Sequence, residues 1–289
     1  MIDGEPSRTA WSAALHRAAH QVIDGGRVFP DPVAVPITGW PPERVADDAL
    51  LHPQRHGLRA FIACRHRYAR DVLVAQGADA QVLVLGAGLD TTAYQPAAVQ
   101  RGTVFEVDHP ATQAWKIERL AEAGISPTAP VRYVPVDFET DDLTDALEAA
   151  GFDRTRPAVV VWLGVTVYLT AAAVDQTLAS LGGLTTARID LVLDYSEGDA
   201  GTGEVARRRT ARVKRVAALG EPWLTHFSPS ELAVLFAHHG FEVAEDLGRS
   251  GWGVRYLGLP PGTPHRPSGH LVHAIRTHRG REEALSQSS

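Results

Sequence analysis

The sequence predicts an α/β fold in which a seven-stranded, mostly parallel sheet carries helices on both faces, an antiparallel hairpin at one edge and an N-terminal helical cap. From residue 81 onward, short apolar runs alternate with helical stretches. Near the C-terminus, the runs 241–247 and 270–277 lack a long helical stretch between them, and parallel pairing would need such a crossover. Residues 1–80 are helical in pattern with a proline-rich interruption, and we interpret them as the cap.

Each parallel strand is predicted from a short apolar run that is followed by a helical stretch. These runs are 81–86, 103–108, 131–137, 158–164 and 189–195. Pro110 stands at a suitable first helical position behind the second run. Ser228, Pro229 and Glu231 form a favourable helix start before the two C-terminal runs.

The composition is that of an ordinary soluble globular protein, with 44% hydrophobic and 21% charged residues in a chain of 289. No run of about 18 apolar residues is present, so we expect no membrane-spanning helix. The first residues lack the apolar segment of a secretory signal, and the single cysteine, Cys64, excludes a disulfide framework. We therefore expect a cytoplasmic protein. The formal charge of −6 argues against general binding of nucleic acid.

The predicted domain organisation has a cap at 1–80 packed on a ligand-binding domain at 81–280, with a disordered tail at 281–289. The basic run 207–215 is interpreted as the solvated face of a helix, with contact to an anionic partner as the alternative. Histidine pairs at i,i+4 spacing lack a third ligand nearby, so no metal site is predicted.

A glycine-rich turn follows the first apolar run and indicates a ligand site. Gly86, Ala87 and Gly88 allow the backbone to turn tightly and approach a ligand, because glycine has no Cβ. Thr91 replaces the third glycine of a dinucleotide-binding turn, and Asp90 lies just before it. An acid here would repel a pyrophosphate, so a cationic or neutral ligand group is predicted and NAD is disfavoured.

Acidic residues at the ends of the next two runs narrow the ligand further. Asp108 lies 20 positions after Gly88, where a carboxylate can accept hydrogen bonds from both ribose hydroxyls of an adenosine. A nucleoside without phosphate, held by a glycine turn and an acid, describes S-adenosylmethionine. Asp137 and Phe138 could bond the adenine amino group and cover its ring, or could instead cap a helix and fill the core.

Arg65 lies in the middle of an apolar helical stripe over residues 57–76. An inward-facing guanidinium needs an anion, because an unpaired buried charge is destabilising by several kcal/mol. The methionine carboxylate of the cofactor would supply this anion through a bidentate contact, and a buried ion pair with Asp or Glu is the alternative. Cys64, next to it, is interpreted as a small core residue.

The sequence resembles the leucine carboxyl methyltransferase family in five blocks: VLVLGAGLDTTAYQ, VFEVDHPATQAWK, RYVPVDFETDDL, VVVWLGVTVYLT and FSPSELAVLFAHHGFEV. The resemblance runs from roughly Arg17 through Ile275. It implies a class I, Rossmann-like methyltransferase fold with S-adenosylmethionine as cofactor. Members of this family include bacterial enzymes of natural-product O-methylation.

The resemblance also assigns roles to residues. Those expected at the cofactor are Arg17, Arg65, Gly86, Ala87, Gly88, Asp90, Asp108, Asp137, Phe138 and Leu163. Arg17 matches a basic residue of the N-terminal helix that reaches the cofactor carboxylate, and Tyr168 matches a family tyrosine near the reacting centre. Leu163 departs from the family pattern, because members usually carry Glu at this position. That Glu would provide a polar contact to the cofactor's amino end or to the substrate pocket.

We therefore predict an S-adenosylmethionine-dependent methyltransferase that O-methylates a carboxylate or hydroxyl of a small-molecule acceptor. A carboxylate is already ionised and needs no base, whereas a hydroxyl needs one, for which Tyr168 or a histidine of the cap or C-terminal segment is a candidate. Two alternatives remain: cyclisation or rearrangement of the cofactor, which Leu163 keeps open, and a cofactor-binding module without activity.

Overall fold

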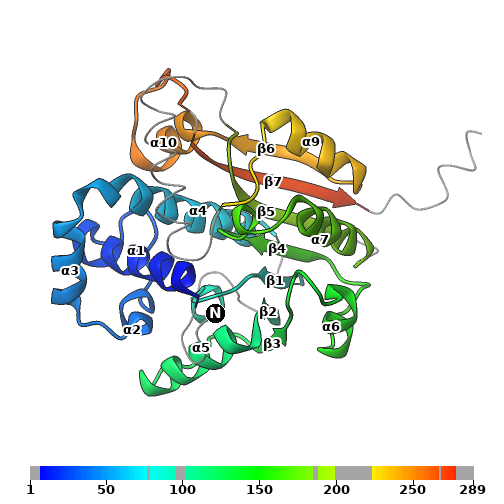
Figure 1. The fold of residues 1–289 in the computed structure, drawn as a ribbon, viewed down its shortest axis with the longest axis horizontal. Helices are drawn as coiled ribbons and strands as arrows, with labels where there is room; N and C mark the ends of the chain where they lie inside the picture. The colour runs from blue at the N-terminus through cyan, green and yellow to red at the C-terminus, as the bar shows by residue number, and fades with distance from the viewer. Residues whose placement is uncertain are drawn as a thin grey trace, which may run out of the picture.

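The strands form a single sheet with the order β3-β2-β1-β4-β5-β7-β6, drawn in Figure 1 from a computed structural model. The structure describes residues 7–76, 79–95, 102–184, 188–198, 223–266 and 268–277. The basic run 207–215 and the expected tail 281–289 lie outside these stretches.

The first five strands are parallel to one another, and β7 runs antiparallel to both β5 and β6. Their bounds are β1 Gln81–Leu85, β2 Val104–Asp108, β3 Val131–Pro135, β4 Ala158–Trp162, β5 Arg188–Ser196, β6 Glu242–Leu247 and β7 Gly269–Thr277. The predicted seven-stranded sheet with an antiparallel edge is confirmed.

The helices begin at the signals that the sequence contains. They are α1 Arg8–Asp24, α2 Ala34–Thr38, α3 Pro42–Leu51, α4 His56–Ala75, α5 Pro110–Glu122, α6 Leu143–Ala149, α7 Ala171–Gly183, α9 Pro229–His238 and α10 Arg249–Leu257, with short 3-10 turns η1 Pro53–Arg55, η2 Thr92–Tyr94 and η3 Thr166–Tyr168. Pro110 opens α5, and Ser228 with Glu231 forms a complete capping box before α9. The helical stretch expected after the first strand is only η2 within the described residues, and the short helix α10 lies between β6 and β7.

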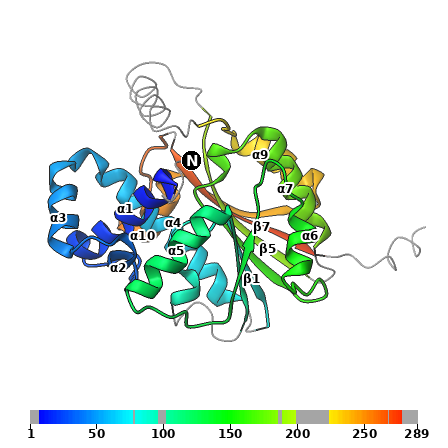
Figure 2. The same ribbon diagram turned by 60° about the horizontal axis from the view of Figure 1, so that its bottom comes forward.

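Apolar layers cover both faces of the sheet, which explains why the central strands β1 and β4 are buried along their whole length. On one face, α6, α7 and α9 enclose a core that includes Trp162 and Phe236. On the other face, α4, α5 and α10 enclose a core that includes Tyr68 and Trp252 (Figure 2). No helix of the described stretches is long and apolar enough to cross a membrane.

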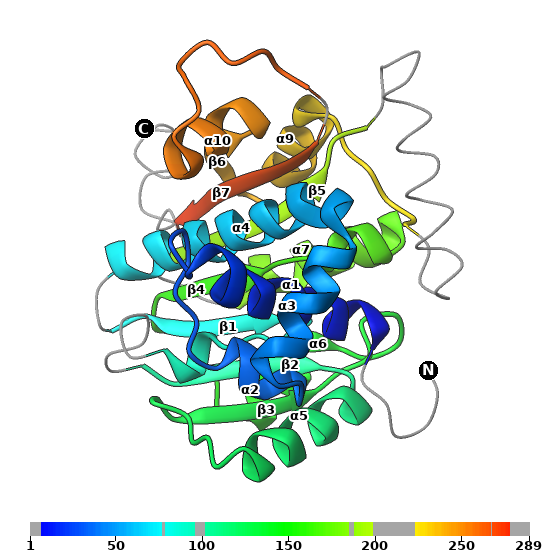
Figure 3. The same ribbon diagram turned by 90° about the vertical axis from the view of Figure 1, so that its left-hand side faces the viewer.

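The N-terminal helices α1, α2 and α3 lie on the same side of the sheet as α4 (Figure 3), where α1 contacts α4 and α2 contacts α5. α4 itself packs directly on β5 and β7. Gly269 at the start of β7 has no room for a side chain, because a Cβ there would collide with the ring of Phe61 on α4. The long helix α4 therefore belongs both to the cap and to the core beside the sheet.

A buried ion pair joins β2 to α5. Nζ of Lys116 lies 2.6 Å from Oε2 of Glu106, and each side chain is about 1% exposed. Burial raises the pKa of Glu106, although the Lys116 ammonium opposes this shift. A charge in such a position is tolerated only because its partner is there.

We expect Lys116→Met to lower the free energy of unfolding by about 3–5 kcal/mol, because it leaves the Glu106 carboxylate buried without a partner. The double variant Glu106→Leu/Lys116→Met should recover most of that loss, since it removes both charges. Urea unfolding followed by tryptophan fluorescence measures both. A double variant as unstable as the single one would contradict this account of the pair.

Candidate functional site

The predicted site residues gather where the parallel strands end. In the register of the sheet, Leu85 at the end of β1 pairs with Val107 of β2, and Trp162 at the end of β4 pairs with Leu193 of β5. The segments that follow β1, β2, β3 and β4 therefore meet at one edge. In open α/β sheets, this carboxyl edge is where ligands bind.

The glycine turn after β1 requires glycine for two separate reasons. Gly86 and Gly88 have φ values of 59° and 47°, in the left-handed region that side chains disfavour. A Cβ on Gly86 would collide with Val165, which follows β4, and one on Gly88 would lie 2.9 Å from Cβ of Ala10 on α1. The turn is thus enclosed by the segment after β4 and by the first helix of the cap.

Asp108 at the end of β2 is fixed against this turn. Its Oδ2 accepts a hydrogen bond from the N–H of Gly88, and its Oδ1 accepts one from the N–H of His109 at 2.6 Å. Burial raises the pKa of Asp108, although these two hydrogen bonds oppose the shift. Each carboxylate oxygen keeps a further lone pair, so Asp108 can still accept hydrogen bonds from a ligand's hydroxyls.

Arg17 of α1 anchors the cap to the segment behind the glycine turn. Its Nη2 donates to the carbonyl of Leu89, and its Nε donates to Oδ2 of Asp31 at 3.1 Å. Thr91, in the position of the missing third glycine, donates its hydroxyl to the same Asp31 oxygen at 2.7 Å. Asp90 points back to its own turn, where Oδ1 accepts from the N–H of Thr92 at 2.7 Å.

Arg65 is on α4, and its guanidinium lies at the ends of β4 and β5. It forms a buried ion pair with an acid, which was the alternative to a contact with the cofactor carboxylate. Its Nη1 is 3.2 Å from Oδ2 of Asp194 on β5, and the other oxygen of Asp194 accepts the N–H of Gly164. A Cβ on Gly164 would lie 2.7 Å from both terminal nitrogens of Arg65, so the backbone covers the guanidinium. The buried Nε of Arg65 has no hydrogen-bond partner among the described residues.

His66, which the sequence interpretation did not single out, belongs to the same site. Its ring stacks on Phe29 with centroids 5.5 Å apart, and its Nδ1 lies 3.5 Å from Oδ2 of Asp90. Burial, and then the charges of Arg17 and Arg65, lower the pKa of His66 well below its ordinary value. The imidazole is therefore neutral at pH 7, and its buried Nε2 has no partner within the described stretches.

The remaining predicted residues lie at the same edge with local partners. Asp137 accepts the N–H of Glu139 at 3.0 Å, and Phe138 packs partly on the core beneath α6 and α7. Leu163 packs partly on the opposite core, and Tyr168 is half-buried in η3. The structure thus links Asp108 to Gly88, and Arg17 to Leu89 next to it, through hydrogen bonds. Arg65 is held separately by Asp194, and Asp137, Phe138, Leu163 and Tyr168 follow the ends of β3 and β4.

A second polar cluster, also missed from the sequence, lies beyond the end of β5. Asp246 binds His270 Nδ1 at 2.6 Å and the hydroxyl of Tyr195 at 2.7 Å. Glu197 bridges Nε2 of His270 at 3.3 Å to Nε2 of the exposed His265 at 3.2 Å. Burial lowers the pKa of His270, but its hydrogen bonds to the two carboxylates outweigh this effect and raise it. The cluster provides a chain of proton-binding groups from the interior to the surface.

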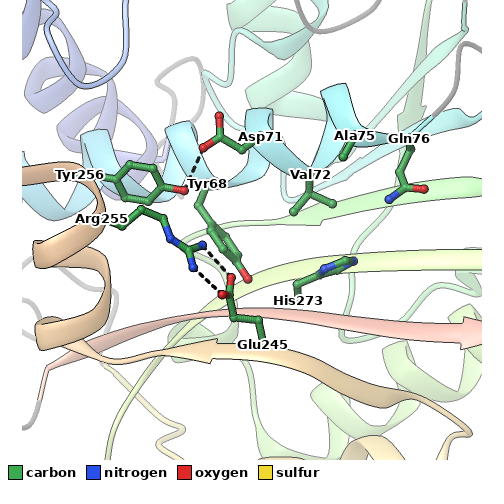
Figure 4. Close-up of a pocket in the computed structure, with 9 residues that line it drawn as sticks. All are labelled: Tyr68, Asp71, Val72, Ala75, Gln76, Glu245, Arg255, Tyr256 and His273. Carbon is green, nitrogen blue, oxygen red and sulfur yellow. Dashed lines mark hydrogen bonds and ion pairs between the residues drawn. The ribbon is translucent and has the colours of Figure 1, made fainter.

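A pocket of about 230 Å³ between α4, α10, β6 and β7 lies elsewhere (Figure 4). Its charged groups are already paired: Arg255 holds Glu245 through two hydrogen bonds of 2.8 and 2.5 Å, and Tyr256 donates to Asp71 at 3.0 Å. It also borders the last turn of α4, which leads to the start of β1, so it faces away from the carboxyl edge. We do not assign the function to this pocket.

Neither the cysteine nor a metal cluster offers another reactive centre in the described stretches. Cys64 is fully buried, and burial raises the pKa of its thiol to about 12, so it stays protonated at neutral pH. No three His, Cys, Asp or Glu side chains of these stretches are grouped in a way that could hold a metal ion.

The chain is similar to known methyltransferases in sequence. The family model described as leucine carboxyl methyltransferase matches residues 10–182. A Mycolicibacterium smegmatis protein named as an S-adenosyl-L-methionine-dependent methyltransferase is 34% identical over 221 residues, which cover 68% of this chain and 72% of that protein. A Mycolicibacterium paratuberculosis protein of the same name is 32% identical over 269 residues, covering 86% and 83%. In a Mycolicibacterium vanbaalenii relative, 34% identical, the match spans 55% of its length.

Solved structures share the fold at lower identity. A duf574 family protein from Streptomyces avermitilis aligns with a TM-score of 0.62 at 17% identity, covering 96% of this chain and 100% of its own. A Thermobifida fusca protein named as a methyltransferase aligns with a TM-score of 0.58 at 21% identity, covering 96% and 97%. At such identities the likeness concerns the fold alone.

The neutral state of His66 predicts a pH dependence of stability. Below about pH 6.5, the ordinary pKa of histidine, the unfolded chain binds a proton that folded His66 does not accept. Wild type should therefore lose up to about 1.4 kcal/mol per pH unit relative to His66→Phe as the pH falls. Urea unfolding between about pH 7.5 and 5.5, one unit either side of that pKa, measures this difference. Parallel pH profiles for the two proteins would contradict it.

Proposed function

The chain belongs to the leucine carboxyl methyltransferase family, and from this premise we propose that it transfers a methyl group to a carboxylate or hydroxyl oxygen of a small-molecule acceptor. It is an S-adenosylmethionine-dependent methyltransferase with S-adenosylmethionine as its cofactor. Its sheet has the Rossmann-like fold of class I methyltransferases. The proposal concerns the acceptor and the residues that serve each half of the reaction.

The carboxyl edge fits the cofactor. The partnerless Nε–H of Arg65 is a buried cationic donor, which suits the methionine carboxylate. The remaining lone pairs of Asp108 suit the two ribose hydroxyls, and the glycine turn lets the backbone approach the nucleoside closely. Asp137 and Phe138 would border the adenine. When bound, the cofactor supplies a methyl carbon activated by the positive sulfur.

The chain's own contribution is alignment. Nucleophilic displacement at an activated methyl group gains most from holding the two reactants in line and excluding water. Asp194 and the backbone of Gly164 hold Arg65 rigidly, so the clamp needs little reorganisation. α1 closes over the glycine turn through Ala10 and shields this side of the site from solvent.

One observation carries the acceptor assignment: residues at the end of β5 hold both the arginine proposed for the cofactor and a pair of histidines. Asp194 on this strand holds Arg65, and three residues further along Glu197 holds His265 and His270. The segment 223–228 connects this end of β5 to the loop of Tyr168, since Leu224 donates to the carbonyl of Val167 and Phe227 to that of Ser196.

This arrangement supports an acceptor beside η3, with Tyr168 near the oxygen to be methylated. A carboxylate there would react without a base. For a hydroxyl, His265 would accept the proton at Nδ1 while Glu197 orients its ring through Nε2, and the half-exposed ring would then release the proton to water. Leu163, which precedes η3 and packs partly on the core, would make the near side of this acceptor position apolar.

Incubation of the protein with methyl-labelled S-adenosylmethionine and a panel of small carboxylic acids, phenols and alcohols tests the proposal. We expect a labelled methyl ester or ether together with an equal amount of S-adenosylhomocysteine, both identified by mass spectrometry. Formation of methylthioadenosine would instead indicate attack within the methionine portion. No labelled product, despite measured cofactor binding, would contradict O-methylation.

The role of Arg65 predicts a specific loss of cofactor affinity. Arg65→Lys keeps the charge for Asp194 but lacks the planar fork that could bind Asp194 and a carboxylate together. We expect the Kd for S-adenosylhomocysteine to rise about tenfold or more, corresponding to about 1.4 kcal/mol. Calorimetric titration measures it, with Arg67→Lys, a partly exposed position on the same helix, as control. Equal affinities for all three proteins would refute this role.

A further inference from the structure

Two buried polar atoms without partners lie on neighbouring residues of α4. Nε of Arg65 and Nε2 of His66 have no hydrogen-bond partner among the described residues, although both residues are more than nine-tenths buried. Buried polar groups are almost always paired in folded proteins, so two such atoms together indicate a ligand. Arg65 has a place in the proposed cofactor site, whereas His66 has been given none.

The surroundings of His66 determine what its free nitrogen can do. Asp90, after the glycine turn, faces Nδ1 at 3.5 Å, and a carboxylate in that position favours the tautomer with the proton on Nδ1. Arg17 from α1 and Arg65 from α4 are the cations close to the ring, and they disfavour a second proton. Phe29, from the loop after α1, covers one ring face. Nε2 is therefore a bare acceptor.

An unpaired donor and an unpaired acceptor on consecutive residues of α4 can together serve the two charged groups of an α-amino acid zwitterion. We propose that His66 is a cofactor-binding residue whose Nε2 accepts a hydrogen bond from the α-ammonium of S-adenosylmethionine, while Nε of Arg65 donates to the α-carboxylate. The inference rests on the cofactor and not on the nature of the acceptor.

The nearby acids are oriented by contacts within the protein. Asp194 accepts from Gly164 and pairs with Arg65. Asp90 uses Oδ1 for the N–H of Thr92 and turns Oδ2 toward His66. The segment after β4 presents the apolar Leu163 instead of an acid. A neutral imidazole whose Nδ1 faces Asp90 would then accept a hydrogen bond from an ammonium group, as a carboxylate could.

The test compares two ligands that differ only at the methionine end. S-adenosylhomocysteine carries the amino acid, and 5′-methylthioadenosine shares the nucleoside and sulfur without it. In calorimetric titrations, His66→Phe should weaken binding of S-adenosylhomocysteine roughly ten- to a hundredfold, the range for a hydrogen bond to a charged group. Its affinity for 5′-methylthioadenosine should stay within about twofold of wild type, a change well under one tenfold step.

Two further variants make the result decisive. His66→Gln keeps an acceptor oxygen and should lie between wild type and His66→Phe, and it serves if the phenylalanine variant fails to fold. His56→Phe, at an exposed position at the start of the same helix, controls for the loss of any histidine and should change neither affinity. An equal loss for both ligands, or no loss for either, would overturn the proposal. Since no acceptor is present, failure of O-methylation would leave this result intact.

Discussion

The buried guanidinium of Arg65 is the constraint on which the site depends. An uncompensated charge in this position would be destabilising by about 3–5 kcal/mol, so α4, β5 and the segment after β4 must meet closely enough to satisfy it. Asp194 supplies the anion, and Gly164 supplies the space by having no side chain. The contact fixes the longest cap helix against the strand ends where the cofactor is expected.

The other connections of the cap act at the same place. Arg17 ties α1 to the carbonyl of Leu89, and the missing Cβ of Gly88 lets α1 lie directly on the glycine turn. The cap therefore contributes residues to the proposed cofactor site. The end of β5 also leads to the proposed acceptor position, because Glu197 follows Asp194 and holds two histidines.

Much of the fold and part of the candidate site could be predicted from local sequence. The strands were predictable because each is a short apolar run between helix signals, and Gly86, Gly88 and Asp108 because their spacing along one strand-turn-strand unit is local. The partner of Arg65 could not be predicted, since Asp194 lies 129 positions away inside a strand whose sequence indicates burial. Glu197 and His270 meet only through the antiparallel pairing of β5 and β7, and His66 was hidden in an apolar stripe.

The central claim is that the methionine end of the cofactor lies between α4 and the end of β5, with its ribose on Asp108. A crystal structure of the protein with S-adenosylhomocysteine tests it most directly. The account predicts the ligand's carboxylate within hydrogen-bonding distance of Arg65 and its ribose hydroxyls on Asp108. A ligand bound with its amino acid portion away from Arg65, or in the pocket beside Tyr256, would contradict it.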